Sequence, residues 1–399
     1  MGKRVRIGMV GSGFSAHFHL ASYRKVYGED FEIAGLCGRN GPRVAELAHA
    51  FGIPACYDSI DAMLRDPAID AIDLCVPNHL HVPLILRAAE HGKHIICEKP
   101  LGGYFGPPDA GADWTADGMP RAAMLEQVMG QIRAVEEAVA RSGVTFCYAE
   151  NWVYAPPVAK LNRLMAASDS TILRIQGEES HSGSHSPYAR HWRTAGGGSL
   201  LRLGVHPIGA ALHLKYEEGR RRGGVTIRPV SVLAQVANLT AIESFRREPV
   251  QHIATGWGDV EDWASITITF EDGAVAQLTS TDTHMGGIRN YITAHGSRAL
   301  VTANINPNTA CQAYTPDGSY FADEYIVEKT ETKEGWSFPA PDEGAVTGYP
   351  EELRDFIGAI ATGRPPKSDL MLARDVLIAV YAGYLSAERG AVVHLRDVT

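Results

Sequence analysis

The stretch Val5-Arg6-Ile7-Gly8-Met9-Val10-Gly11-Ser12-Gly13-Phe14-Ser15-Ala16 decides the fold of this chain. The apolar run at 5–10 predicts a buried strand, and two glycines follow it directly. Without side chains, these glycines let backbone N–H groups at the start of the next helix approach a pyrophosphate, whose charge a helix N-terminus favours. We therefore expect a nucleotide site at this turn, formed by Gly11, Gly13, Phe14 and Ser15.

Downstream, short apolar runs continue to alternate with helical periods. Continuously apolar strands linked by helices indicate a parallel sheet covered on both faces, with ligands at the carboxyl ends of the strands. The chain is therefore predicted to begin with a doubly wound α/β Rossmann domain over residues 1–150. The expected strands are 5–10, 32–37, 71–76, 94–97 and 144–149, with helices near 15–27, 42–51, 81–91 and 121–141.

Residues 102–119 interrupt this alternation. They contain Gly, Pro, Asp and Trp without any period, which is typical of an exposed loop longer than most connections. The segment is either a lid over a ligand or a surface insertion.

From Asn151 onward, longer strands with alternating polarity predict an α+β domain with a mainly antiparallel open sheet over residues 151–399. We expect this domain to bind the substrate and to mediate oligomerisation, with two terminal helices packing back on the first domain. The predicted strands are 171–179, 225–239, 263–270, 274–280, 291–294 and 299–303, and the terminal helices are 351–361 and 370–389.

Composition narrows the class of protein. The 399 residues are 45% hydrophobic and 21% charged, as in a folded globular enzyme. A net charge of −9 disfavours nucleic-acid binding, and no run of about 20 apolar residues predicts a membrane span. The N-terminus leads straight into strand-like sequence, and the six cysteines form no CxxC pair. A cytoplasmic protein with reduced, structural thiols is expected.

The residue that would hold the adenosine ribose is unusual. An Asp or Glu commonly ends the second strand of such domains, but Gly38-Arg39-Asn40 stands there. Arg39 could bind a 2′-phosphate, stack on adenine, or do neither. The cofactor is therefore expected to be NAD, and NADP is not excluded.

Three further motifs resemble the Gfo/Idh/MocA oxidoreductase family of sugar and cyclitol dehydrogenases: Val76-Pro77-Asn78-His79-Leu80-His81, Gly92 through Glu98-Lys99-Pro100-Leu101, and Gly196 through Arg202 to His206. The resemblance implies that Lys99 binds substrate and tunes proton transfer, and that Pro77, Asn78, His81 and Glu98 lie at the cofactor. Helix capping explains His79 and His81 equally well. Pro100 is a candidate for a cis bond that would help to fix the lysine.

Oxidation of a carbinol needs a base beside the hydroxyl, because the hydride leaves readily only as the proton is removed. His206 is the expected base. A histidine in an apolar helix is more often a core residue, but the surrounding match favours catalysis. Tyr154 is a candidate general acid, although packing explains it as well, and Tyr148 and Asn151 are candidate substrate contacts at the domain crossing.

One residue departs from the family pattern. Arg202 stands where the dehydrogenases usually have an aspartate, and a permanent donor suits an oxyanion. With the histidine- and arginine-rich stretch 181–193, it suggests a pocket for a carboxylate, sulfonate or phosphate. A surface loop explains that stretch too, and zinc binding is not expected because acidic and cysteine ligands are missing. The candidate substrate residues are His181, His185, Arg190, Trp192 and Arg202.

These features lead to three hypotheses. The first is an NAD(P)-dependent oxidoreductase acting at a ring carbon of an anionic sugar. The second, also within the resemblance, is a redox-neutral NAD-dependent glycosidase such as a sulfoquinovosidase, which would oxidise, eliminate, hydrate and reduce its substrate. The third is a nucleotide-sensing regulator, which the retention of both Lys99 and His206 disfavours. The resemblance also implies a homodimer or homotetramer.

Overall fold

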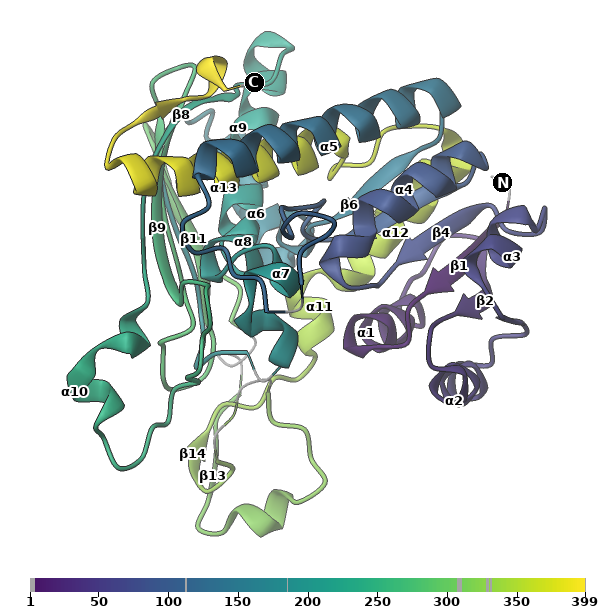
Figure 1. Ribbon diagram of the computed structural model, residues 1–399, viewed down its shortest axis with the longest axis horizontal. Coiled ribbons are helices and arrows are strands. Elements are labelled where there is room, and N and C mark those ends of the chain that lie inside the picture. Colours follow the sequence, from purple (N-terminus) through teal and green to yellow (C-terminus); the bar gives the residue numbers. More distant parts are fainter. Residues whose placement is uncertain are drawn as a thin grey trace.

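The computed structural model describes residues 4–111, 113–184, 186–306, 311–327, 330 and 332–398, and it forms two domains (Figure 1). The first domain is built on six parallel strands in the order β3-β2-β1-β4-β5-β6. This order confirms the predicted doubly wound sheet. The strands are β1 (Val5–Val10), β2 (Phe31–Cys37), β3 (Cys56–Tyr57), β4 (Ala71–Leu74), β5 (His94–Glu98) and β6 (Phe146–Ala149).

The register of these strands brings four loops to one edge of the sheet. Val10 pairs with both Cys37 and Leu74, Leu74 pairs with Cys97, and Cys97 pairs with Tyr148. The residues that follow β1, β4, β5 and β6 therefore meet at the carboxyl edge, where the strand order reverses and ligands bind in such sheets. The helices of this domain are α1 (Phe14–Tyr23), α2 (Gly41–Phe51), α3 (Ile60–Arg65), α4 (His81–Glu90) and α5 (Arg121–Ser142).

The second domain contains a seven-stranded mixed sheet in the order β12-β11-β7-β10-β9-β8-β15. Only β7 and β10 are parallel neighbours, so the sheet is mainly antiparallel, as predicted. Along β9, alternate residues are buried and half-buried, which gives the sheet one covered and one open face. The strands are β7 (Ile172–Ser180), β8 (Pro229–Ala237), β9 (Trp263–Phe270), β10 (Val275–Thr281), β11 (Arg289–Gly296), β12 (Leu300–Asn304) and β15 (Val393–His394).

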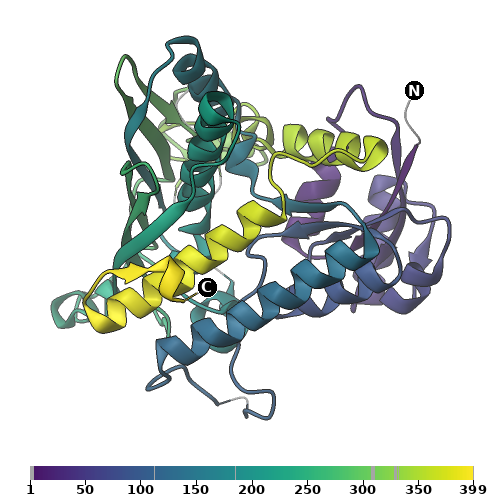
Figure 2. The same ribbon diagram turned by 90° about the horizontal axis from the view of Figure 1, so that it is seen from above.

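Long helices join the two domains. Helix α9 (Val205–Gly223) is buried along most of its length, and α13 (Leu370–Arg389) lies alongside α5 (Figure 2). Among the described helices, α13 has the length and apolar composition of a membrane span, but 78% of its most apolar window is buried in the protein. It is thus a core helix. The other principal helices are α6 (Pro156–Ala167) and α12 (Tyr349–Thr362).

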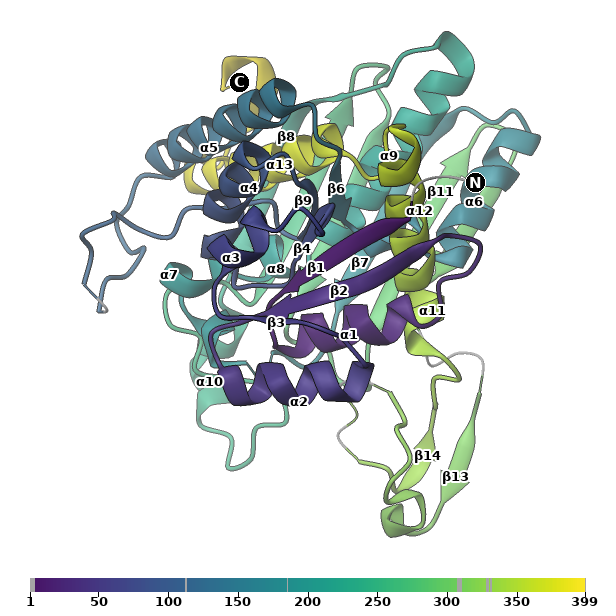
Figure 3. The ribbon, with the colours of Figure 1, turned by 90° about the vertical axis from the view of Figure 1, so that its right-hand side faces the viewer.

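A small two-stranded ribbon, β13 (Ala313–Thr315) and β14 (Gly335–Ser337), projects away from both sheets (Figure 3). All six cysteines are free thiols, and four of the five in or next to strands of the first domain (Cys37, Cys75, Cys97 and Cys147) are buried. The ribbon and the exposed Cys56 and Cys311 play no part in the site described next.

Candidate active site

The glycine turn after β1 has the shape of a phosphate cradle. Gly11 has a φ of 124°, and a Cβ there would lie 2.0 Å from the carbonyl oxygen of Cys75. A Cβ on Gly13 would meet no heavy atom within 4 Å, and no side chain caps the start of α1. The first turn of α1 thus presents backbone N–H groups to open space, which fits a dinucleotide pyrophosphate. Phe14, 67% exposed, and the half-buried Ser15 begin this helix.

Arg39 follows β2 at the same edge and is exposed. Burial, and then the charge of Arg39, lower the pKa of His79, which follows β4. The two side chains therefore lie near each other across the carboxyl edge, on the side where the adenosine end of a dinucleotide would lie.

The loop after β4 connects the two domains and supports the lysine. Pro77 is exposed, whereas Asn78 donates from Nδ2 to the carbonyl oxygen of Ala195 in the second domain, at 2.9 Å. His81 is fully buried, and its ring nitrogens lie 2.6 Å from the oxygen of Pro100 and 3.0 Å from that of Val76. His81 thus braces the peptide after Lys99 and is turned away from the cofactor edge. The Lys99–Pro100 bond is cis.

Lys99 follows β5 and reaches across to the second domain. Its Nζ donates to the carbonyl oxygen of Arg202 at 3.1 Å, and its backbone N–H donates to Oε2 of Glu98 at 3.0 Å. The ammonium is therefore placed at the domain boundary.

His206 lies at the start of α9, 5% exposed, with its ring stacked on Trp152 at 5.8 Å between centroids. Its Nδ1 is 2.7 Å from Oε1 of Glu150, and its Nε2 is 3.9 Å from Oε2 of Glu179. Neither carboxylate was among the predicted residues. Glu150 follows β6 directly, so its position after a parallel strand could have singled it out, whereas nothing in the sequence pattern distinguishes Glu179.

The electrostatics join these groups into one site. Burial lowers the pKa of His206 to about 4, and the charge of Lys99 also lowers it, while Glu179 opposes the shift. Burial raises the pKa of Glu150 well above its usual range, against the effect of Lys99. Lys99, His206 and Glu150 therefore lie close enough for their charges to interact.

Arg202 does not contribute the free positive charge that the sequence suggested. Its guanidinium pairs with the fully buried carboxylate of Asp282, whose other oxygen lies 3.7 Å from Nδ1 of His181. Within the described part of the chain, the Nε–H of Arg202 is buried without a hydrogen-bond partner, and its Cζ lies 5.0 Å from the ring centroid of Trp257. The pocket is therefore less positive than the sequence suggested, because Asp282 neutralises the arginine.

Four other predicted residues are buried side chains: Trp192, Asn151, Tyr154 and Tyr148. Trp192 is buried and donates from Nε1 to the carbonyl oxygen of Tyr104. Asn151 donates to the oxygen of Thr347, and the Tyr154 hydroxyl donates to Asp355 while accepting from the backbone of Ser368. The Tyr148 hydroxyl is buried without a hydrogen-bond partner among the described residues, and burial and then Glu150 raise its pKa. Arg190 is half-buried beside Gly256, and His185 lies outside the described residues.

The 102–119 segment is fastened to the second domain. Arg193 donates to the carbonyl oxygens of Phe105, Pro107 and Ala110, at 3.2, 3.4 and 2.7 Å. The backbone N–H of Ala116 donates to Asp259 at 2.6 Å. The 102–119 segment is thus a bridge between the domains. The hydrogen bonds to Arg193 and Asp259 would have to break before the segment could act as a lid.

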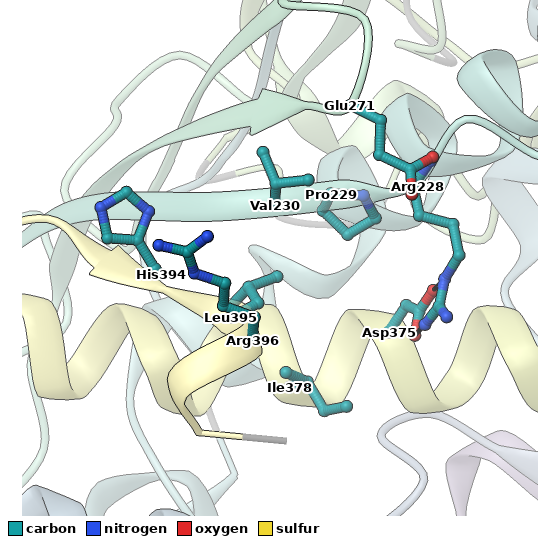
Figure 4. Close-up of a pocket in the computed structure, with 9 residues that line it drawn as sticks. All are labelled: Arg228, Pro229, Val230, Glu271, Asp375, Ile378, His394, Leu395 and Arg396. Carbon is teal, nitrogen blue, oxygen red and sulfur yellow. Dashed lines mark hydrogen bonds and ion pairs between the residues drawn. The ribbon is translucent and has the colours of Figure 1, made fainter.

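A surface cavity of about 420 Å³ lies elsewhere, between β8, the start of α13 and the C-terminal segment (Figure 4). Asp375 lines it and accepts a hydrogen bond from Tyr216, which is ten residues beyond His206 on α9 and so about 15 Å along the helix axis. Two arginines, Arg228 and Arg396, also line the cavity, and Arg228 pairs with Asp375. The chemistry gathered around Lys99 is thus separate from this cavity.

Comparisons with known proteins agree with this geometry. The model described as oxidoreductase family, NAD-binding Rossmann fold, matches residues 5–104, and that of the GFO/IDH/MocA C-terminal domain matches residues 170–302. The chain is 26% identical over 385 residues to levoglucosan dehydrogenase of Pseudarthrobacter phenanthrenivorans, covering 90% of each protein. It is 22% identical to myo-inositol 2-dehydrogenase of Thermotoga maritima over 99% of each. The structure of GenD2 from gentamicin A biosynthesis, in complex with NAD, superposes with a TM-score of 0.77 at 24% identity, covering 99% of this chain and 97% of that one.

Proposed function

The chain belongs to the GFO/IDH/MocA oxidoreductase family, and from this premise we propose that it oxidises a hydroxyl group on a ring carbon of a sugar. The observation that carries the proposal is the meeting of Lys99 with the His206–Glu150 pair at the carboxyl edge of the NAD-binding sheet. NAD, held by the glycine turn, supplies the acceptor for the hydride.

The protein's own residues handle the proton. Glu150 accepts from Nδ1 of His206, so that Nε2 is left to take the proton of the substrate hydroxyl, and the carboxylate stabilises the resulting imidazolium. The ammonium of Lys99 stabilises the negative charge that develops on the same oxygen. Because His206 and Glu150 share one site, the pair as a whole sets the pH at which the base works.

For the substrate, we propose a sugar that carries an acidic group. The support is the buried Nε–H of Arg202, which has no hydrogen-bond partner among the described residues and lies beside Trp257, with Arg190 against the neighbouring Gly256. An aromatic ring suits the apolar face of a sugar ring, and a guanidinium N–H suits an oxyanion. Since Asp282 neutralises Arg202, the preference for an anion over a neutral sugar is expected to be moderate.

The test is to incubate the protein with NAD and a panel of neutral sugars, cyclitols, uronic acids and sulfonated sugars, together with their aryl glycosides. NADH absorbance and aglycone release are followed together. We expect NADH in proportion to the sugar consumed, without aglycone release. Catalytic aglycone release without net NADH formation would contradict the dehydrogenase function and would favour the redox-neutral glycosidase. Lys99→Ala and His206→Ala are each expected to lower kcat by about 10²- to 10⁴-fold.

A further inference from the structure

A fully buried histidine connects the first helix to the residue that precedes the active-site lysine. His19 lies on α1, its Nδ1 is 2.9 Å from Oδ2 of Asp73, and its Nε2 is 3.2 Å from Oε1 of Glu98. Asp73 also accepts from the hydroxyl of Tyr23 at 2.9 Å. Sequence patterns singled out none of His19, Asp73 or Tyr23.

The hydrogen bonds define the charge of this ring. A neutral imidazole has one N–H and one acceptor nitrogen, whereas both partners of His19 are carboxylates, which only accept when ionised. When both carboxyl groups are ionised, the two contacts require N–H groups on both ring nitrogens. An imidazolium held between two anions satisfies charges that would otherwise be costly to bury.

One side chain, that of Glu98, connects the His19 ring to the active site. Glu98 accepts from His19 at Oε1 and from the backbone N–H of Lys99 at Oε2. The same helix that carries His19 begins at Gly13 in the phosphate cradle. The path from cradle to lysine thus consists of α1, one imidazolium and one carboxylate.

Resting on the proposed function, we propose that His19 is a positioning residue, which holds Glu98 as a charged imidazolium and so fixes Lys99 relative to the dinucleotide-binding helix. The catalytic groups remain Lys99 and His206. His19 acts on them through Glu98 alone.

The groups around His19 agree with a charged ring. Burial opposes the charge, but Cys75 and Asp73 raise the pKa of His19 well above its usual value. From α12, Tyr349 stacks edge-on against the ring at 5.9 Å, and the buried Glu352 also adds a charge interaction with His19. Burial tends to raise the pKa of Glu98, yet His19 and Lys99 bring it below its usual value.

The first experiment measures the ring charge directly and needs no turnover. Full-length protein labelled with ¹⁵N-histidine is compared with His19→Gln by long-range ¹H–¹⁵N NMR, which assigns the His19 ring. Both ring nitrogens are expected to be protonated from pH 6 to at least pH 8. A neutral His19 ring at pH 7 would overturn the proposal, whatever the enzyme's activity.

The second experiment tests the positioning role. His19→Gln is expected to lower kcat by about 10- to 100-fold, because a displacement of Lys99 by about an ångström has an effect of that order. The Kd for NAD is expected to change less than about threefold. Glu98→Gln should give a similar loss. The double variant His19→Gln/Glu98→Gln, which keeps the net charge, should lose no more than either single variant.

The matched control is Tyr23→Phe. It removes a donor to Asp73, as His19→Gln does, but leaves the His19–Glu98 contact intact. Its kcat is expected to stay within about twofold of the parent at a comparable loss of thermal stability. Equal kcat losses in Tyr23→Phe and His19→Gln would reduce His19 to a structural residue.

A readout independent of turnover separates this proposal from the proposed function. Lys99 lowers the pKa of His206, so His19→Gln, which keeps the Glu98 charge that also acts on His206, should raise the pKa of His206 measured by NMR if Lys99 has moved. An unchanged His206 titration would overturn the positioning role even in a protein that oxidises no sugar.

Discussion

The burial of His206 controls the pH response. Burial lowers the pKa of His206 to about 4, so the ring is neutral and able to accept a proton well below the ordinary histidine value of about 6.5. We expect kcat/KM for oxidation to stay constant as the pH falls through 6.5 and to decline only toward pH 4 to 5. A profile that falls with an apparent pKa near 6.5 would contradict the buried, neutral base.

Glu150→Gln provides the matching variant. The amide keeps the size of the side chain but removes the charge that stabilises the imidazolium, so kcat should fall by about 10²-fold. Glu217→Gln is the control and should leave kcat unchanged, because Glu217 is a half-buried residue farther along α9 that pairs with Arg220.

The Arg202–Asp282 pair provides a second prediction. Arg202→Gln leaves a buried carboxylate without its cation, and such single removals typically cost about 3–5 kcal/mol. Arg202→Gln/Asp282→Asn removes both charges and should recover most of the unfolding free energy measured by denaturant titration. If Arg202 contacts an acidic substrate, the double variant loses activity on anionic sugars more than on neutral ones. Equal losses on both would remove the oxyanion role.

Single residues were predictable where a motif fixes them to a strand end. Lys99 and His206 were identified through such motifs, and they meet across the domain boundary. Glu150 and Asp282 were missed, because whether an acidic residue after a strand faces a histidine or an arginine depends on how two distant domains pack. For the same reason the neutralisation of Arg202 could not be read from the chain.

At the scale of elements, the turn from β1 into α1 gives a pair of variants with opposite expectations for folding. Gly11→Ala places a Cβ 2.0 Å from a carbonyl oxygen and at a positive φ, so it should lower the melting temperature markedly and abolish NAD binding. Gly13→Ala has open space and a φ of −86°, so it should fold normally yet bind NAD at least about tenfold more weakly, because the methyl group occupies the cradle.

Calorimetry with NAD and thermal unfolding without it measure the two effects separately. Gly13→Ala that binds NAD as tightly as the parent would place the pyrophosphate elsewhere. Gly118→Ala, at a positive φ in the 102–119 segment with open space around it, is a control for backbone strain alone.

The elements themselves were largely predictable, since apolar runs and helical periods mark buried strands and covering helices. Apart from the two-residue strands β3 and β15, which were not predicted, the strands of both sheets overlap their predicted ranges. What the pattern could not supply is the state of the 102–119 segment. Its anchors, Arg193 and Asp259, are distant in sequence and carry no local signal for it.

At the scale of the whole molecule, the open face of the second sheet is the remaining unpaired surface among the described elements. Leu233 on β8 pairs with Thr267 on β9, which pairs with Gln277 on β10. The row continues through Gln176 on β7, Thr293 on β11 and Thr302 on β12, so that uncharged side chains form a row across six strands. No helix covers this face in Figures 1 and 2. A row of uncharged side chains can pack against a second copy of the same face without desolvation of a charge along that row, while the flanking rows carry Arg174 and Glu178.

We therefore expect a homodimer or homotetramer assembled through this row. Light scattering at micromolar concentration should give a multiple of the 43.1 kDa chain mass. Leu233→Arg/Thr267→Arg places two like charges on each copy at the centre of the row, and their mutual repulsion should yield a monomer. Leu164→Arg, on the exposed side of α6, adds a charge outside the row and should leave the assembly intact. Because the Lys99–His206 site lies at the domain boundary within one chain, the monomeric variant should retain NAD binding. A parent that is already monomeric, or a double-arginine variant that still assembles, would exclude the open face as the interface.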